Sequence, residues 1–199
     1  MPHLGSIAEI RMGATLRGRD ATRPDPNGSH RLIRIGDLSS DGELLKLDPL
    51  RFEPRTQISE NLLLKPGDVL FPNRGTRLTA HAFTLDLPNV IVGAQFFVLR
   101  PDPTQLLPGY LAWFLRGEEA AAHFTARRKG TLVQVLERND LRELPVPVPP
   151  LPTQEQIVEL SALGRRERQI SERLTELKWQ QLNLRLTTVA HTPSIESFS

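Results

Sequence analysis

Three clusters of cationic and polar side chains stand out in stretches of the sequence that are poor in apolar residues. They are Arg17, Arg19 and Arg23, then Asn73, Arg74 and Arg77, and finally Arg127, Arg128 and Lys129 with Thr131. Guanidinium, ammonium, amide and hydroxyl groups can contact phosphate oxygens and the edges of bases. Several such clusters on the loops of one rigid body are typical of DNA recognition, although arginine on a loop is also common on an ordinary solvated surface.

The sequence gives little support for catalysis. The absence of cysteine excludes disulfides, a thiolate nucleophile and Cys-ligated metals. The five histidines are scattered along the chain, with no pair at helical spacing and no accompanying group of carboxylates. Neither a glycine-rich phosphate loop nor a G-x-S-x-G nucleophile motif is present. We therefore expect no catalytic residue, no metal ligand and no cofactor in this chain.

The composition indicates one globular domain with an appendage. The chain has 199 residues, 39% of them hydrophobic, which is enough for one ordinary core. Lysine and arginine number 25 against 23 acidic residues, and 21 of the 25 are arginine. This arginine bias suits phosphate and guanine recognition, and a GC-rich coding sequence would also produce it. Without an apolar run of signal-peptide or membrane-spanning length, we expect a cytoplasmic protein.

A mixed α/β fold is expected to position the three clusters. Up to about residue 106, short apolar runs broken by Gly, Pro, Asn and Asp predict strands and loops. The expected strands are 6–11, 31–36, 68–72, 78–85 and 90–99, the last buried on both faces. Residues 14–30 are expected to form a long exposed loop. The spacing of aromatic and small residues predicts a helix over 108–126 that packs one face into the core, followed by a short charged turn at 138–143.

The C-terminal part is predicted to be a stiff joint followed by a long helix. The stretch LPVPVPPLP (144–152) holds the backbone extended, although it also resembles a ligand for proline-recognition modules. Thr153 and Gln156 have the spacing of a capping box at a helix start. The predicted organisation is thus a domain at 1–143, a joint at 144–152, a helix at 153–190 and a disordered tail at 191–199.

The predicted helix carries a heptad seam. Its members are Leu160, Leu163, Glu167, Ile170, Leu174, Leu177, Gln181 and Leu184, which alternate steps of three and four residues. Such a helix needs a partner, because its length, roughly 54 Å at 1.5 Å per residue, exceeds the body of a domain this size. It could fold back over its own domain, but we favour pairing with another helix through the six apolar seam residues.

These features together resemble the DNA-specificity subunit of type I restriction-modification systems. The resemblance covers about 190 of the 199 residues. The proline-rich joint leading into a Gln/Glu-rich helix start, LPVPVPPLPTQEQ (144–156), is its most specific motif, followed by KPGDVLFPNRG (65–75). Supporting segments are IAEIRMG (7–13), RLIRIGDL (31–38), FFVLRPD (96–102), LPGYLAWFL (107–115) and KGT (129–131).

The resemblance implies a target-recognition domain whose loops read one half of a bipartite site in double-stranded DNA, followed by a spacer helix. In that family the specificity subunit is not catalytic. It docks modification subunits, which methylate adenine with S-adenosylmethionine, and through them a restriction subunit that uses ATP and Mg. These cofactors are therefore expected only on partner subunits.

The chain departs from the family pattern because it has one recognition domain and one helix where members usually have two of each. It therefore resembles a half-subunit that forms a homodimer. A parallel pair would place Glu167 opposite Glu167 of the second copy, so we expect an antiparallel pair. The alternative is a coiled-coil scaffold protein of the same fold that has lost DNA reading.

Overall fold

The computed structural model describes residues 1–16, 23–74, 79–127 and 135–191. The chain divides into two compact units, Met1–Val158 and Glu159–Ser199. The first unit combines two sheets with short helices, and the second continues one long helix, so the predicted mixed α/β fold with a long C-terminal helix is confirmed. Within the described residues, no helix has the length and apolar character needed to cross a membrane.

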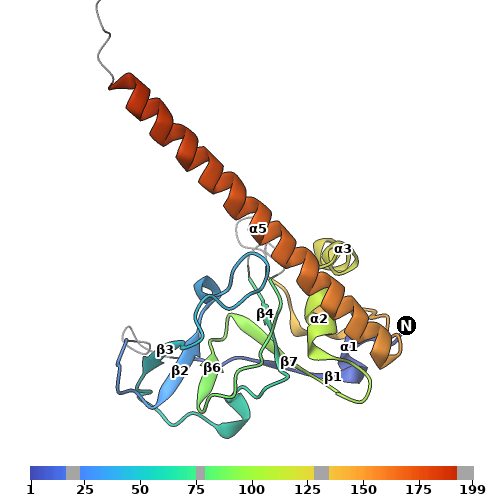
Figure 1. Ribbon diagram of the computed structural model, residues 1–199. Helices are drawn as coiled ribbons and strands as arrows, with labels where there is room; N and C mark the ends of the chain where they lie inside the picture. The colour runs from blue at the N-terminus through green and yellow to red at the C-terminus, as the bar shows by residue number, and fades with distance from the viewer. Residues whose placement is uncertain (17–22, 75–78, 128–134, 192–199) are drawn as a thin grey trace, which may run out of the picture. The chain divides into compact units, whose positions relative to one another are not determined.

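The larger sheet is antiparallel throughout and has four strands (Figure 1). Its strands, in spatial order, are β1 (Ala8–Met12), β7 (Phe96–Pro101), β4 (Val69–Pro72) and β5 (His81–Ala82). The central strand β4 is buried along its whole length, and β7 along most of it. This burial explains why both strands read as continuous apolar runs in the sequence.

The smaller sheet contains a parallel pair of strands. Its strands are β3 (Leu50–Phe52), β2 (His30–Ile33) and β6 (Val90–Val92), and β2 pairs with β3 antiparallel and with β6 parallel. The 3-10 helix η1 (Ile35–Asp37) lies in the connection from β2 to β3, and the 3-10 helix η2 (Glu60–Leu62) lies in the connection from β3 to β4.

The prediction of a single strand over 90–99 is wrong. A turn separates β6 from β7 and sends them into different sheets, with the amide of Phe96 donating to the carbonyl of Gly93 at 3.0 Å. Because both strands are buried, the apolar run continues on each side of the turn. Periodicity therefore could not show where one strand ends and the next begins.

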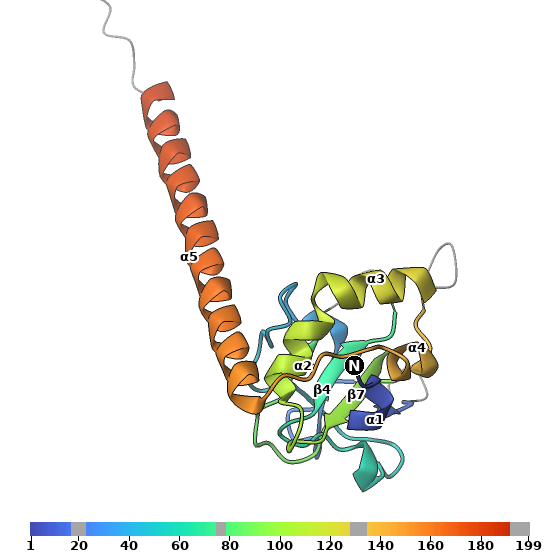
Figure 2. The ribbon, with the colours of Figure 1, turned by 90° about the vertical axis from the view of Figure 1, so that its right-hand side faces the viewer.

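In the described part of the first unit, four short helices accompany the sheets. They are α1 (Leu4–Ile7), α2 (Pro108–Leu115), α3 (Glu118–Arg127) and α4 (Arg138–Arg142). Helix α2 packs on the larger sheet beside β4, β5 and β7 (Figure 2). Phe124 of α3 lies 5.4 Å from Phe71 of β4 between ring centroids, so α3 contributes to the same core.

The single helix predicted over 108–126 is interrupted at Arg116 and Gly117. The amide of Gly117 donates to the carbonyl of Phe114, and Arg116 reaches the carbonyl of Ala80 at 2.6 Å. The hydrogen bond from Arg116 to Ala80 anchors the helix break next to the start of β5. The charged turn expected at 138–143 is the short helix α4, which Asp140 caps by accepting the amide of Glu137 at 2.7 Å.

The KPGDVLF segment has a structural role. Gly67 adopts a φ of 99°, which favours glycine. The fully buried carboxylate of Asp68 accepts two hydrogen bonds from Arg100, at 2.7 and 2.8 Å, and one from the amide of Lys65. Arg11 lies 3.6 Å from the same carboxylate. This network ties together three neighbouring strands of the larger sheet, β1, β7 and the start of β4.

The proline-rich joint leads into helix α5 (Leu151–Ala190), which begins two residues before the predicted start. Thr153 therefore lies inside the helix, and the predicted capping box is not formed. The buried side chain of Gln154 instead fixes the helix start. It donates to the carbonyls of Gln105 and Pro149, both at 2.8 Å, and accepts the amide of Leu107 at 2.9 Å.

The second unit is the remainder of α5, and its apolar side chains are exposed in the described chain. The six apolar members of the seam are between 45% and 69% exposed. A second apolar stripe, which the sequence reading missed, lies on another face of the same helix. It consists of Trp179, Leu182, Leu186 and Val189, again at steps of three and four residues.

Candidate nucleic-acid interface

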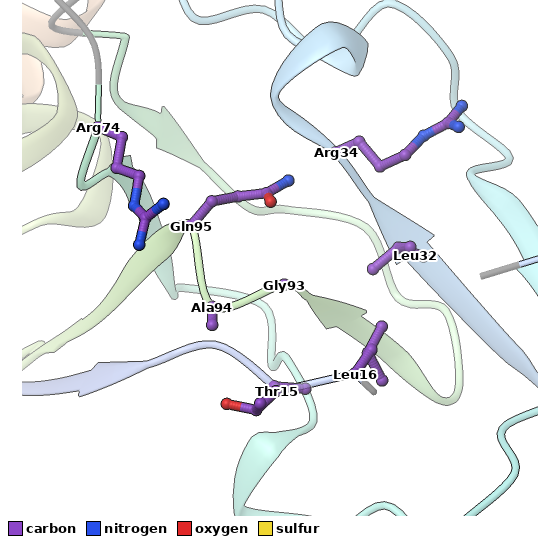
Figure 3. Close-up of a pocket in the computed structure, with 9 residues that line it drawn as sticks. Thr15, Leu16, Leu32, Arg34, Arg74, Gly93, Ala94 and Gln95 are labelled. Carbon is purple, nitrogen blue, oxygen red and sulfur yellow. The ribbon is translucent and has the colours of Figure 1, made fainter. Parts of the chain in front are cut away.

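A pocket of about 340 Å³ lies beside the turn that separates β6 from β7. Its lining residues come from β2 of the smaller sheet, from the segments that follow β1, β2 and β4, and from the turn itself. They are Ala14, Thr15, Leu16, Leu32, Arg34, Arg74, Gly93, Ala94 and Gln95 (Figure 3). Arg74 and Arg34 stand on opposite sides of Gln95 in this view, and Leu16 and Leu32 provide an apolar wall. Among the described residues, the lining thus carries two guanidinium groups and no carboxylate.

Close backbone contact closes one wall of this pocket. The amide of Ala14 donates to the carbonyl of Val92 at 2.7 Å, and the amide of Gly13 donates to the carbonyl of Phe96 at 3.0 Å. A Cβ atom on Gly13 would lie 2.3 Å from the carbonyl oxygen of Gly93, far inside van der Waals contact. Glycine is therefore required at position 13 for the chain after β1 to meet the turn.

We expect Gly13→Ala to destabilise the first unit by about 1–3 kcal/mol, because the added methyl group must displace backbone atoms. The matched control is Gly36→Ala, since a Cβ atom at Gly36 meets nothing within 4 Å. Urea unfolding followed by circular dichroism measures both variants. Equal unfolding midpoints for the two would show that the close contact at Gly13 is not a constraint.

Asn73 holds the turn in place from the end of β4. Its amide donates to the carbonyl of Gln95 at 2.9 Å, and its side-chain Nδ2 donates to the carbonyl of Ala94 at 2.8 Å. The side chain is buried, and its Oδ1 has no hydrogen-bond partner among the described residues. Asn73 was predicted from the sequence as a DNA contact, and the structure places it beneath the turn with a positioning function.

The segments that flank the three sequence-predicted clusters come together near the pocket. Leu16, which directly precedes the first cluster, lines it, as does Arg74 of the second cluster. Val135, four residues after Thr131, pairs with Arg74 in an antiparallel bridge, and the amide of Leu136 donates to the carbonyl of Asn73 at 2.9 Å. Six predicted contacts themselves lie outside the described residues, namely Arg17, Arg19, Arg77, Arg128, Lys129 and Thr131.

Two other predicted contacts do not line the pocket. Arg23 is exposed. Arg127, at the end of α3, contacts other residues of the first unit. Its Nη1 lies 3.2 Å from Nδ1 of His123, and its Nε lies 4.0 Å from the carboxylate of Glu143. Of the predicted residues that the structure describes, only Arg74 therefore contributes its side chain to the pocket.

Arg34, Gln95 and Thr15 are pocket residues that the sequence reading missed. Arg34 lies within a predicted strand, and Gln95 lies inside the apolar run over 90–99. The small and polar triplet Gly-Ala-Gln at 93–95 interrupts that run, and it was the available signal of a turn. Thr15 falls in the stretch that was expected to be an exposed loop.

Several other arginines of the first unit are committed to the fold. Arg11 and Arg100 bind Asp68, Arg31 binds Asp48 and the carbonyl of Pro88, and Arg116 binds the carbonyl of Ala80. Arg74, by contrast, is exposed, and its side chain has no hydrogen bond or ion pair with the described residues. Its guanidinium group is therefore available to an external anion or base.

The family model for the type I restriction modification DNA specificity domain matches residues 3–178. The chain therefore belongs to the family of type I restriction-modification DNA specificity domains. A sequence comparison with curated proteins gave no match.

Several solved structures share the fold of this chain. A chain from a study of complex assembly and conformational transition of the type I R-M system aligns with a TM-score of 0.66 at 20% identity. The S subunit from M. genitalium aligns with a TM-score of 0.55 at 15% identity. The HsdS subunit from Thermoanaerobacter tengcongensis aligns with a TM-score of 0.54 at 22% identity. These alignments cover 91%, 85% and 90% of this chain but 42%, 40% and 39% of the longer chains.

Proposed function

We propose that the first unit binds double-stranded DNA sequence-specifically and reads one half of a bipartite site. One observation carries this proposal. The segments that flank the three clusters meet near a pocket whose described lining residues include two arginines and no acidic residue. Membership of the specificity-domain family supports the same function. Loops projected from a rigid two-sheet body provide the fixed geometry that base and phosphate contacts need.

The second unit is proposed to pair with α5 of a second copy in an antiparallel homodimer. In one register, Ile170 faces Leu174 of the second copy, and Glu167 faces Leu177 of the second copy, next to its Lys178. This register keeps the two Glu167 carboxylates apart and buries the apolar seam residues that are exposed in the single chain. The dimer would present two recognition domains to two inverted half-sites.

In this proposal the chain is a non-catalytic specificity subunit. Its remaining partners are a modification subunit, which would supply adenine methylation with S-adenosylmethionine, and a restriction subunit that would use ATP and Mg. The chain's own contribution is to select the DNA sequence. The support for these partners is the family to which the chain belongs.

The exposed Arg74 gives a direct test of DNA binding. We expect Arg74→Ala to weaken binding of the full chain to duplex DNA and, if the lost contact is to a phosphate, to lower the slope of log affinity against log salt by about 1. Fluorescence anisotropy with labelled duplexes selected from a random library measures both quantities. The matched control is Arg138→Ala, which removes an exposed arginine from α4, outside the pocket.

Two outcomes would contradict the proposed function. The wild-type chain could select no sequence from the library, with and without the modification subunit, which would favour a scaffold protein. Alternatively, Arg74→Ala and Arg138→Ala could weaken binding equally, which would remove the pocket from the DNA interface.

A further inference from the structure

We propose that Gln95 is a specificity-determining residue that reads the edge of one base, and that Arg34 and Arg74 hold the DNA backbone on either side of it. This inference rests on the proposed function, because it assigns separate tasks to the residues of the same pocket. Three structural observations carry it: the rigidity of the turn, the free amide of Gln95 and the charges beside it.

Hydrogen bonds from Asn73 fix the backbone at Gln95 and at the residue before it. The carbonyl of Gln95 accepts the amide of Asn73, and the preceding carbonyl of Ala94 accepts Nδ2 of the same asparagine. The hydrogen bond from Phe96 to Gly93 closes the turn. Such a turn fixes the direction of the Cα–Cβ bond of Gln95, and a fixed backbone position is what a residue that discriminates between bases requires.

The side chain of Gln95 is exposed and forms no hydrogen bond within the described part of the chain. Its carboxamide lies over the neighbouring glycine, since a Cβ atom built on Gly93 would meet Cδ of Gln95 at 3.6 Å. The amide therefore remains next to the pocket wall with a donor and an acceptor unused. A glutamine offers both groups at once, which matches the N6 and N7 positions of adenine in the major groove.

The arginines on the two sides are suited to a different task. The Nε atom of Arg34 lies 3.5 Å from the carboxylate of Asp37, and the side chain is 51% exposed, so its outer nitrogens can still contact an anion. Arg74 has no partner among the described residues. Because none of the described lining residues is a carboxylate, these guanidinium groups favour phosphate on either side of the base that Gln95 reads.

Leu16 and Leu32 complete the pocket with an apolar wall. Such a wall can contact a deoxyribose or a thymine methyl group. A carboxylate in place of the Gln95 amide would retain the shape of the side chain but remove its donor. Gln95→Glu is therefore the conservative variant that separates shape from hydrogen bonding.

The test is selection of duplexes from a random double-stranded DNA library by the full chain, followed by sequencing of the bound pool. We expect Gln95→Ala and Gln95→Glu to lose preference at one position of the motif by roughly 5- to 150-fold, with the other positions unchanged. Arg34→Ala and Arg74→Ala should lower the affinity for all sequences and keep the motif. Gln57→Ala is the matched control, since Gln57 is exposed in the loop after β3 and does not line the pocket.

The outcomes separate this inference from the proposed function. If the wild-type chain selects a motif and both Gln95 variants select the same motif with equal preference at every position, the assignment of Gln95 is overturned while DNA reading stands. If the wild-type chain selects no motif, the proposed function fails, and the inference fails with it. A change of motif in Arg34→Ala or Arg74→Ala would overturn the division of tasks.

Discussion

Asp68→Ala is expected to destabilise the first unit by about 3 kcal/mol, because it leaves two arginines without their shared anion. Burial lowers the pKa of the Arg11 guanidinium, and the charge of Asp68 opposes this change. The hydrogen bonds from Arg100 to Asp68 raise the pKa of Arg100. Removing the carboxylate therefore leaves Arg11, whose side chain is only 14% exposed, charged and without an anion, with only the carbonyls of Leu62 and Leu63 to accept its hydrogen bonds.

The chain contains a matched control in which an aspartate also lies between two arginines. Asp48 is 3.1 Å from Arg31 and 3.8 Å from Arg51, but its side chain is 66% exposed. Water can replace this carboxylate, so we expect Asp48→Ala to cost less than about 1 kcal/mol. Urea unfolding of both variants measures the difference. If the two variants unfold at the same denaturant concentration, burial of the Asp68 network does not stabilise the fold.

The sequence predicted strands and helices well where their pattern was regular. The long C-terminal helix was visible in its heptads, and β4 was visible as a short apolar run bounded by Pro and Gly. The breaks inside apolar segments were not predicted. The turn at Gly93 and the helix break at Gly117 are both fixed by hydrogen bonds to residues distant in sequence, Asn73 in one case and Ala80 in the other.

The sequence likewise predicted only part of the candidate site. Reading loops for cationic residues identified Arg74, which is exposed at the pocket. It missed Gln95, which lies inside the strand predicted over 90–99, and it missed the buried position of Asn73. Which side chains share a pocket depends on how the two sheets pack against each other, and no local pattern in the sequence encodes that packing.

Leu174→Glu is expected to convert the proposed homodimer to a monomer at micromolar concentration. In the antiparallel register, Leu174 faces Ile170 of the second copy, so one substitution introduces two carboxylates into the seam. Burying one leucine side chain contributes about 1.5–3 kcal/mol, and the dimer loses two such contributions. The dissociation constant should therefore rise by at least about 100-fold, since each 1.4 kcal/mol is a factor of ten. Analytical ultracentrifugation measures the change.

The second apolar stripe of α5 supplies the control that decides which face pairs. Trp179 is 62% exposed and Leu174 is 50% exposed, and they lie on different faces of the same helix. If the heptad seam forms the dimer, Trp179→Glu should leave the chain dimeric while Leu174→Glu dissociates it. The reverse result would place the interface on the stripe formed by Trp179, Leu182, Leu186 and Val189. A wild-type chain that remains monomeric would contradict pairing through either face. In the proposed homodimer each recognition domain reads one of two inverted half-sites. Leu174→Glu should therefore also reduce binding to such DNA to the level of a single half-site.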